Sequence, residues 1–352
     1  MNRLVFATYA VAATFFLAGC APAPQGGAET GLTPLSSSRL TSMLLPQGTT
    51  HRHDRGPSWI SPDAPKIKEL LYVSDWGTDD VFIYNYKNGA LSGRLTGFAE
   101  PYGQCVDKDG NVWITNLDSN AVVEYAHGGT TPLKTLKGAG HSAGCSIDPT
   151  TGNLAVANFD QPAELQIYKK AAGAATVYKS AGCDEDMWSP GYGKKGNLYV
   201  EGSNYSIATV CEFAHGGKKL LGPVKLLNFQ IGLGGGVMWD GTHLTLTDQY
   251  YTGQTLTAVY QVSEEESGNL NKTGVTVLTD SQCGGGVRVP QPFVAGNKNT
   301  PLNRTQGTAI LGGNLQCLSR FGIWNYPAGG NPHRTLQSPP AQPFGQSLSI
   351  AP

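Results

Sequence analysis

A run of three carboxylates, Asp184-Glu185-Asp186, is the strongest candidate for chemistry in this sequence of 352 residues. The run stands where a strand is expected to begin, and the other strands expected in this sequence begin with mainly apolar residues. Side-chain carboxylates can bind a divalent cation, and they can also act as a general acid or base. An acidic run in a solvated loop is the competing interpretation, and the sequence leaves both open.

Polar residues also recur at the ends of expected strands, and these residues are Asp75, Asn116, Asn158, Glu201 and Asp248. Asn158 and Asp248 are candidate channel or ligand residues. So is His141, which precedes an expected strand and could act as a general base. Asp and Asn side chains at such places also cap the following turn through its backbone, and their repetition favours that role.

Cys20 is a candidate for lipid modification. Residues 1–20 begin with a short region that carries Arg3, continue through the apolar stretch Leu4–Leu17 and end in Leu17-Ala18-Gly19-Cys20. This organisation predicts an export signal. Its last four residues resemble the bacterial lipobox, in which the Cys thiol receives diacylglycerol, and two or three acyl chains anchor a protein stably. We therefore expect attachment to the bacterial membrane in the cell envelope, at the outer membrane if the host is Gram-negative.

The remaining six cysteines are expected to form disulfides, because their number is even and exported proteins meet an oxidising compartment. Cys105 and Cys145 occupy equivalent places in adjacent repeats. The predicted pairs, chosen among the roughly fifteen pairings that six cysteines allow, are Cys105 with Cys145, Cys183 with Cys211, and Cys283 with Cys317. No Cys-x-x-Cys or paired Cys-His spacing occurs in the sequence, which disfavours zinc binding by these cysteines.

The elements that would position these residues are short strands in a repeat of roughly 40 to 50 residues. In Pro101–Asn116, apolar residues flank Asp107–Asn111, whose Asp-Gly-Asn core is typical of a tight β-hairpin turn. Variants of this hairpin are Ser142–Asn158, Cys183–Gly202 and Gly235–Asp248. The sequence therefore predicts one hairpin of this kind in each repeat.

Two further strands follow the hairpin in most repeats. The first is an apolar run that ends in an aromatic residue, such as Val122–Tyr125, and the second is a short strand such as Leu133–Leu136 or Val224–Leu227. Glycine turns such as Ala126-His127-Gly128-Gly129 separate the two, and His127 and its counterpart His215 are expected to serve these turns. Four antiparallel strands in a repeated unit predict the blades of a β-propeller.

A last copy of the motif lies near the C-terminus. Pro343-Phe344-Gly345-Gln346 matches Pro101-Tyr102-Gly103-Gln104 in residue type, whereas the first repeat, from Leu70, lacks such a strand. We expect the C-terminal strand to join the first blade and close the ring, which removes open sheet edges. The predicted fold class is all-β: a six-bladed β-propeller with four-stranded antiparallel blades at 67–352, after a signal peptide at 1–20 and a flexible tether at 21–66.

Composition supports this fold and excludes one class of partner. The chain has 46 glycines, 22 prolines and 14% charged residues, which is typical of many turns and short strands. Its formal net charge is −1, so it offers no basic surface for nucleic acid. Two stretches are candidate ligand or partner surfaces, the Pro- and Asn-rich insertion Val289–Gln306 and the loop Gln249–Gln254.

The motif in Pro101–Tyr125 resembles NHL-type and streptogramin-lyase-like propeller repeats, and it is also similar to the wider gluconolactonase-like six-bladed group. The resemblance covers residues 67–352 as an architecture, and it implies a fold more than a reaction. Enzymes of the gluconolactonase-like group hold a divalent cation in the channel. The resemblance therefore makes calcium or zinc in the channel the candidate cofactor. The residues of this sequence do not by themselves imply a cofactor. The His and Glu set of the lyases has no residue-by-residue match.

These features favour a lipid-anchored β-propeller that acts as a non-catalytic binding or scaffold module in the bacterial envelope, with an envelope protein or a glycan as its partner. The alternative is a metal-dependent lactonase or lyase that uses the central channel. Its candidate residues are Asp184, Glu185, Asp186, Asn158 and Asp248. The sequence identifies neither the ligand nor the oligomeric state.

Overall fold

The computed structural model describes residues 56–352 except 139, 159–162, 180–186, 204–207, 266–267, 290–291, 297–306, 315–316, 318–319 and 337–340. All described residues belong to the compact unit Leu32–Pro352. Their regular structure consists of β-strands and short 3-10 helices, which confirms the predicted all-β class. Within these residues no helix is long and apolar enough to span a membrane.

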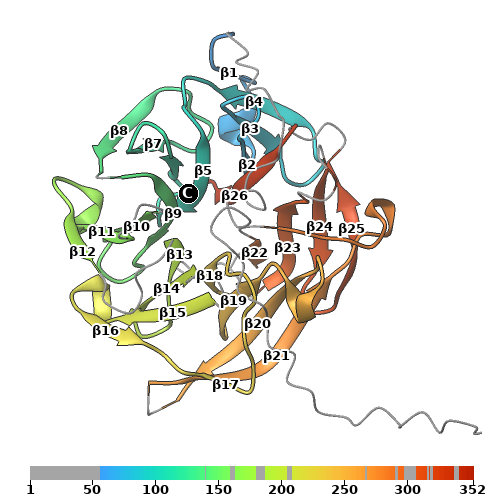
Figure 1. Ribbon diagram of the computed structural model, residues 1–352. Coiled ribbons are helices and arrows are strands. Elements are labelled where there is room, and N and C mark those ends of the chain that lie inside the picture. Colours follow the sequence, from blue (N-terminus) through green and yellow to red (C-terminus); the bar gives the residue numbers. More distant parts are fainter. Residues whose placement is uncertain are drawn as a thin grey trace, which may run out of the picture. The chain divides into compact units, whose positions relative to one another are not determined.

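The strands form runs of four antiparallel neighbours, which we number as sheets 1 to 6 in chain order (Figure 1). Sheet 1 contains β26 (Pro343–Ile350), β2 (Glu69–Asp75), β3 (Asp80–Asn85) and β4 (Leu91–Leu95), with β1 (Trp59–Ile60) at its outer edge. Sheet 2 contains β5 (Pro101–Val106), β6 (Val112–Asn116), β7 (Ala121–Tyr125) and β8 (Pro132–Lys137). Sheet 3 contains β9 (Ser142–Ile147), β10 (Leu154–Asn158), β11 (Glu164–Tyr168) and β12 (Thr176–Lys179).

The second half of the chain continues the pattern. Sheet 4 contains β13 (Met187–Tyr192), β14 (Leu198–Ser203), β15 (Ala208–Phe213) and β16 (Leu220–Pro223). Sheet 5 contains β18 (Val237–Trp239), β19 (Leu244–Asp248), β20 (Thr257–Glu264) and β21 (Leu270–Leu278). Sheet 6 contains β22 (Phe293–Gly296), β23 (Gly307–Gly313), β24 (Phe321–Asn325) and β25 (Gly329–Thr335). One parallel bridge, Leu278 to Gly330, joins sheets 5 and 6.

Five 3-10 helices are present in the described residues: η1 (Ala64–Lys66), η2 (Lys169–Ala171), η3 (His215–Gly217), η4 (Tyr251–Gly253) and η5 (Ser281–Cys283). Strand β1 and helix η1 lie within the segment expected to be a tether, and β1 pairs with β4 through Trp59 opposite Arg94. The expected strand Val224–Leu227 differs from the observed structure. Its place in sheet 4 is taken by β16, while β17 (Leu226–Leu227) pairs in parallel with β21 of the next sheet.

The hairpin between β5 and β6 forms for the predicted reason. The Asp107 carboxylate accepts hydrogen bonds from the backbone N–H groups of Asp109 and Asn111, each at 2.9 Å. Gly110 adopts φ +83°, a left-handed conformation that suits glycine. The side chain of Asp107 therefore stabilises this turn. Similar turn residues recur in the other repeats of the sequence.

Strand β26 pairs antiparallel with β2, with Val73 opposite Gln346 and Leu71 opposite Leu348. The first strand of each sheet, β26 in sheet 1, lies innermost in Figure 1. These inner strands contact one another in the order β26, β5, β9, β13, β18, β22 and again β26. The C-terminal strand thus occupies the position in sheet 1 that β5 occupies in sheet 2.

Glycines allow the inner strands to approach closely. A Cβ on Gly144 of β9 would lie 2.6 Å from both the Trp188 carbonyl oxygen and the Ser189 Cβ of β13. A Cβ on Gly345 of β26 would meet the Tyr102 carbonyl of β5. Because ordinary side chains cannot occupy such gaps, glycine is required where the backbones converge.

A separate hydrophobic cluster fills each space between consecutive sheets. Between sheets 6 and 1, Leu71 and Val73 of β2 pack with Leu311 of β23 and Ile323 of β24. Corresponding clusters lie between sheets 1 and 2, 2 and 3, 3 and 4, 4 and 5, and 5 and 6. Burying each large aliphatic side chain contributes roughly 1.5–3 kcal/mol, so the sheets depend on contact with both neighbours.

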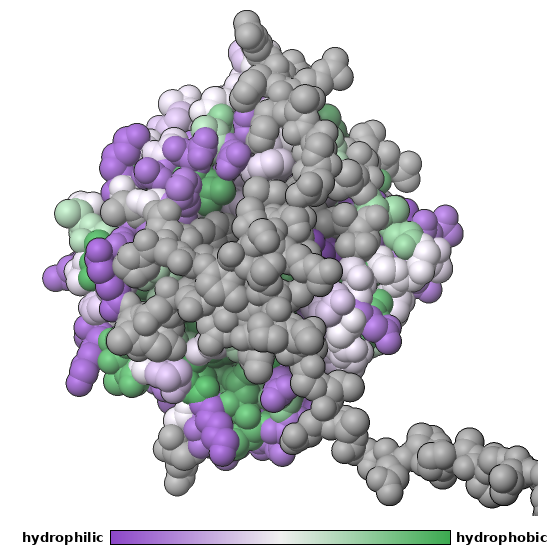
Figure 2. Space-filling model, viewed as in Figure 1, coloured by the Kyte–Doolittle hydropathy of each residue, from purple (hydrophilic) through white to green (hydrophobic). Residues whose placement is uncertain are grey.

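The face shown in Figure 2 has hydrophilic side chains over much of its rim, and an apolar patch gathers near β17. Leu221 of β16 is 54% exposed, and both residues of β17 are half-buried. Isolated apolar groups on a surface are ordinary, so the patch near β17 carries no assignment of its own.

Candidate functional site

A cavity of about 200 Å³ lies where the inner strands end in their hairpin turns. We call this end of the inner strands the turn end, and the end at which the strands begin the start end. Every inner strand contributes to the cavity wall, and one representative of each is Val106, Ile147, Tyr192, Met238, Phe293 and Leu348. The cavity therefore depends on segments from six sheets.

The wall of this axial cavity is nearly neutral. Asp107 and Lys108 are the charged residues that line it. The Asp107 carboxylate is occupied by its own turn, and Lys108 Nζ lies 2.7 Å from the Asp109 carboxylate. The Gln104 amide is also engaged, because its Nε2 donates to Ser74 Oγ and its Oε1 accepts from Ser347 Oγ, both at 2.8 Å. The surface left for a ligand combines apolar and polar atoms in comparable amounts.

Tyr192 is one of the residues that line this cavity. Its hydroxyl is buried and has no hydrogen-bond partner among the residues described. Burial raises the pKa of this phenol, and the Asp148 carboxylate raises it further, so the group stays neutral.

A second cavity of about 450 Å³ adjoins the first between sheets 2 and 3, and it is more polar. Its charged groups are largely satisfied within the protein. Lys134 Nζ lies 3.5 Å from the Glu124 carboxylate and 5.2 Å from the centre of the Trp113 ring. Its Nζ also donates to the Ala171 carbonyl at 3.1 Å. These contacts connect sheets 2 and 3, so the charged side chains of this cavity have a structural role.

At the start end, the polar residues that end the second strands hold backbone loops. Asp75 accepts from the N–H groups of Ala341 and Gln342, and Asn116 accepts from Ala99 N–H. Asp248 accepts from Leu233 and Tyr250 N–H at 3.2 and 2.9 Å. Asn314, which sequence reasoning missed, accepts from Arg288 N–H at 3.0 Å. Capping of the following turn is confirmed for Asp75, which also accepts from Gly77 N–H at 3.0 Å, and for Asp248. Asn116 instead holds the loop that precedes β5.

Glu201 does not belong to that set, because β14 continues beyond it to Ser203. The register places Gly202 opposite Met187, as Asn116 lies opposite Pro101. Glu201 is fully buried, and its Oε2 accepts from Gly235 N–H at 3.0 Å while Oε1 has no hydrogen-bond partner among the described residues. Burial raises the pKa of this carboxyl well above its ordinary value.

The candidate residues from the sequence do not converge on a described site. Asp184, Glu185 and Asp186 lie outside the described residues, as does Cys20. Asn158 is buried at the end of β10, opposite Ser142. His141 is exposed, and its Nε2 lies 3.9 Å from the Asp118 carboxylate. Burial raises the pKa of Asp248, whose carboxylate is occupied by the backbone contacts above.

The glycine-turn histidines bridge neighbouring segments. The two ring nitrogens of His127 lie 2.7 Å from Ser349 Oγ and 2.7 Å from the Ile67 carbonyl oxygen. His215 uses Nδ1 toward the Lys195 carbonyl at 2.7 Å and Nε2 toward Thr150 Oγ1 at 3.1 Å. The prediction that these histidines serve the turns is confirmed.

Gln249 is not a surface residue, although it begins a loop that the sequence offered as a candidate surface. It is fully buried, and its Nε2 donates to the Gly234 carbonyl at 2.5 Å. The other candidate surface, Val289–Gln306, contains β22, and residues 290–291 and 297–306 of it lie outside the described part.

Two predicted disulfides are confirmed. Cys105 bonds Cys145 across sheets 2 and 3, and Cys283 bonds Cys317 within the last repeat, each with a Cα–Cα distance of 5.6 Å. Cys211 is also disulfide-bonded. Its partner lies outside the described residues, as Cys183 does. Cys105 and Cys145 also line the axial cavity.

Metal ligands are the remaining question at the centre. Within the described ranges, no group of three or more His, Cys, Asp or Glu side chains lies close enough to hold a metal ion. The chemistry that the described walls offer is therefore apolar contact and hydrogen bonding. The signal that sequence reasoning missed is the set of apolar inner-strand ends, which are distant in sequence and meet only after folding.

No family model matches the chain, and no curated protein matches it. Solved structures do. A functionally unknown protein from Desulfotomaculum acetoxidans is 10% identical, with a TM-score of 0.54, and the match covers 80% of this chain and 99% of that one. A chain of a nidogen/laminin complex is 13% identical, with a TM-score of 0.57 and coverage of 80% and 98%.

The Cps50 (Swd1) β-propeller domain of Myceliophteria thermophila is 11% identical, with a TM-score of 0.52, and the match covers 82% of this chain and 88% of that chain. Identities this low show the fold alone. Together with the four-stranded antiparallel sheets, these likenesses show that the chain has a β-propeller fold.

Proposed function

We propose that this protein is a lipid-anchored, six-bladed β-propeller that acts as a non-catalytic binding module in the bacterial envelope. Sheets 1 to 6 are its blades, and pairing of β26 with β2 closes its ring. Three features support this architecture: the pairing itself, the cyclic order of inner-strand contacts, and the cluster between sheets 6 and 1. The export signal and lipobox-like residues that end at Cys20 support the anchor.

The axial cavity at the turn end is the binding site in this proposal. The observation that carries it is a wall built by all six inner strands, in which the charged side chains and the Gln104 amide are already engaged within the protein. Such a wall gains free energy chiefly from burying apolar surface. The ligand is therefore a small, uncharged and largely apolar group, either free or presented by an envelope partner.

A cavity-filling substitution tests this site. Ser146 lines the cavity and is half-buried, so Ser146→Phe should block it without disturbing the core. The matched control is Ser119→Phe, at a half-buried position in the turn after β6. Ligand-observed NMR with small neutral aromatic compounds should detect binding to the wild-type protein and the control, with at least a tenfold loss in Ser146→Phe. Equal binding by all three proteins would contradict the proposal.

Two further measurements separate this proposal from the lactonase alternative and test the anchor. Stoichiometric calcium or zinc that is lost in Asp248→Asn, together with lactone hydrolysis, would contradict a non-catalytic module. Metabolic labelling with an alkyne fatty acid should mark the wild-type chain in the membrane fraction, while Cys20→Ser should be unlabelled. Labelling that persists in Cys20→Ser would contradict the anchor.

A further inference from the structure

Arg288 is a buried cation that is not among the residues lining the axial cavity. It lies between η5 and β22, at the start end, and is only 9% exposed. Its neighbours Val287 and Val289 are fully buried in the cluster between sheets 5 and 6. Because side chains alternate along an extended segment, Arg288 points away from that cluster. The Tyr102 phenol of β5 raises the pKa of Arg288 electrostatically, against the larger effect of burial.

The backbone around Arg288 is fixed from two sheets. Asn314 Oδ1 accepts from Arg288 N–H at 3.0 Å, and Asn314 Nδ2 donates to the Gly286 carbonyl at 3.1 Å. Val289 N–H donates to Thr257 Oγ1 of β20 at 2.9 Å. A segment held in this way presents its arginine in a defined direction, as a binding group requires.

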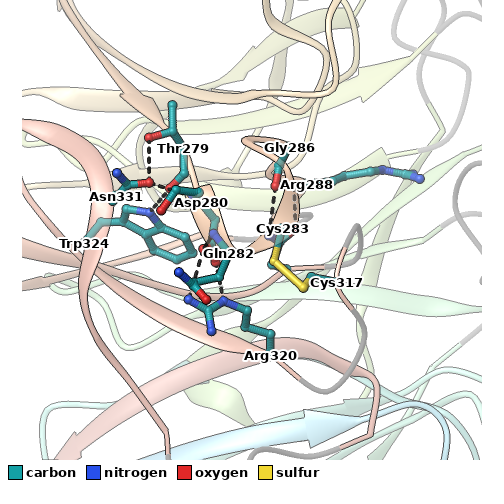
Figure 3. Close-up of polar contacts among 12 residues, drawn as sticks. Thr279, Asp280, Gln282, Cys283, Gly286, Arg288, Cys317, Arg320, Trp324 and Asn331 are labelled. Carbon is teal, nitrogen blue, oxygen red and sulfur yellow. Dashed lines mark hydrogen bonds and ion pairs between the residues drawn. A yellow bond between two sulfur atoms is a disulfide. The ribbon is translucent and has the colours of Figure 1, made fainter.

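The guanidinium of Arg288 is not neutralised within the described part of the chain. Its Nη2 is buried without a hydrogen-bond partner there, and none of the ion pairs between described residues involves it. In Figure 3 its side chain extends away from the Cys283–Cys317 disulfide and from the Asp280–Arg320 pair, with no dashed contact at its end. Arg320 is the opposite case, since its Nε and Nη2 both donate to the Asp280 carboxylate.

Burial does not remove this charge. Desolvation lowers the pKa of Arg288 to about 10, so the side chain remains protonated at neutral pH. Leaving a buried charge without a counter-ion is unfavourable, and proteins normally pair such groups. Arginine is suited to planar, two-point recognition of carboxylate and phosphate oxygens.

We propose that Arg288 forms an anion-binding subsite at the start end of the central channel, for a carboxylate or phosphate group of a small ligand. The subsite is separate from the axial cavity at the turn end, and it does not depend on the ligand proposed for that cavity. Its chemistry is charge-assisted hydrogen bonding to a group that the described protein does not supply.

Thermal unfolding in matched salts tests the subsite. Sodium phosphate and sodium acetate are compared with sodium chloride at equal ionic strength and pH. The wild-type Tm should rise with the concentration of phosphate, acetate or both, by about 2 to 4 °C well above the dissociation constant. Phosphate alone would identify a phosphoryl ligand, acetate alone a carboxylate, and a response to both the shared oxygen chemistry. Equal Tm values in all three salts would overturn the proposal.

Two arginine variants form the control. Arg288→Met should lose the anion response while its Tm in chloride is unchanged or higher, because an unpaired buried charge has been replaced by an apolar chain. Arg320→Met should lower the Tm, because it leaves Asp280 buried without its partner, yet it should keep the anion response. An anion response that persists in Arg288→Met would overturn the subsite. So would a loss of stability in chloride as large as that of Arg320→Met.

Discussion

At the scale of single residues, Glu201 shows how one position can differ from its counterparts. The equivalent positions in sheets 1, 2 and 5 are Ser74, Thr115 and Thr247. The hydroxyl of Thr115 reaches the next sheet at the Ala143 carbonyl, and Glu201 likewise reaches Gly235 of the next sheet. A carboxyl has thus been placed where small side chains usually link neighbouring sheets.

The raised pKa of Glu201 predicts a pH dependence of stability. The folded protein keeps this proton to a higher pH than the unfolded chain, whose glutamates have pKa values near 4.5. The free energy of unfolding should therefore fall as pH rises from about 4.5 through the folded pKa, by about 1.4 kcal/mol for each pH unit between the two pKa values. Below that window the contribution is fully present.

Glu201→Gln removes this titration and keeps a carbonyl for Gly235. Urea unfolding should show the variant to be more stable than the wild-type protein at pH 8, with the difference disappearing near pH 4.5. Gln254→Ala, at an exposed position without a titratable group, should leave the pH profile unchanged. Parallel profiles for Glu201→Gln and the wild-type protein would contradict the assigned burial.

The start end also shows what sequence reasoning could reach for single residues. The capping role of Asp75 and Asp248 was predictable because short polar side chains bond local backbone. The unpaired state of Arg288 was not, since it depends on which carboxylates lie nearby after folding. Sequence reasoning grouped Glu201 with the caps because the residue at the cap position of sheet 4 is Gly202, which has no polar side chain, and Glu201 stands next to it.

At the scale of elements, the strands follow the sequence pattern closely. The expected strand Val122–Tyr125 lies within β7, and Leu133–Leu136 lies within β8. Alternating apolar residues and Asp-Gly-Asn turns determine these elements locally. Strand β1 was missed because it has only two residues and forms by pairing with a strand from another part of the chain. The residues of β17 were expected in a strand, but in sheet 4 and not in a parallel pair with β21. Such short strands have no period to detect.

Close approach of the inner strands predicts a selective effect of alanine. Gly144→Ala would place a methyl group against Trp188 and Ser189 of β13, so we expect a loss of about 1–3 kcal/mol in the free energy of unfolding, as in overpacked cores. Gly234→Ala is the matched control, since the nearest atom to its Cβ is 3.4 Å away. Denaturant unfolding measures both, and equal stability of the two variants would contradict close packing at the axis.

At the scale of the whole molecule, the proposed ring closure makes the C-terminal strand essential. Removing residues 343–352 would expose the edge of β2 and open the cluster that contains Leu348. We expect lower solubility and a Tm reduced by many degrees, whereas removal of Pro352 alone should have little effect. A truncated protein that melts as the full chain does would show that β26 does not close the ring.

The repeat of Pro101–Gln104 at Pro343 made the partner of β2 predictable, because both segments present the same residue types to the same kind of neighbour. The axial cavity was not predictable in this way. Its wall combines inner-strand ends from Gln104 to Ile350, and its volume depends on how closely six strands converge. The fold could therefore be predicted from repeated local sequence, whereas the cavity depends on how all six inner strands pack together.

The most direct test of the central claim uses the methyl group of Met238 as a reporter of the axial cavity. The chain has four methionines, so 13C-methyl labelling gives few signals. Met238 lines the cavity, whereas Met187 is buried between sheets 3 and 4 and serves as an internal control. On titration with benzyl alcohol, a neutral aromatic probe, the Met238 signal should shift saturably while the Met187 signal stays in place. A Met238 signal that does not move up to the solubility limit would contradict ligand binding in this cavity.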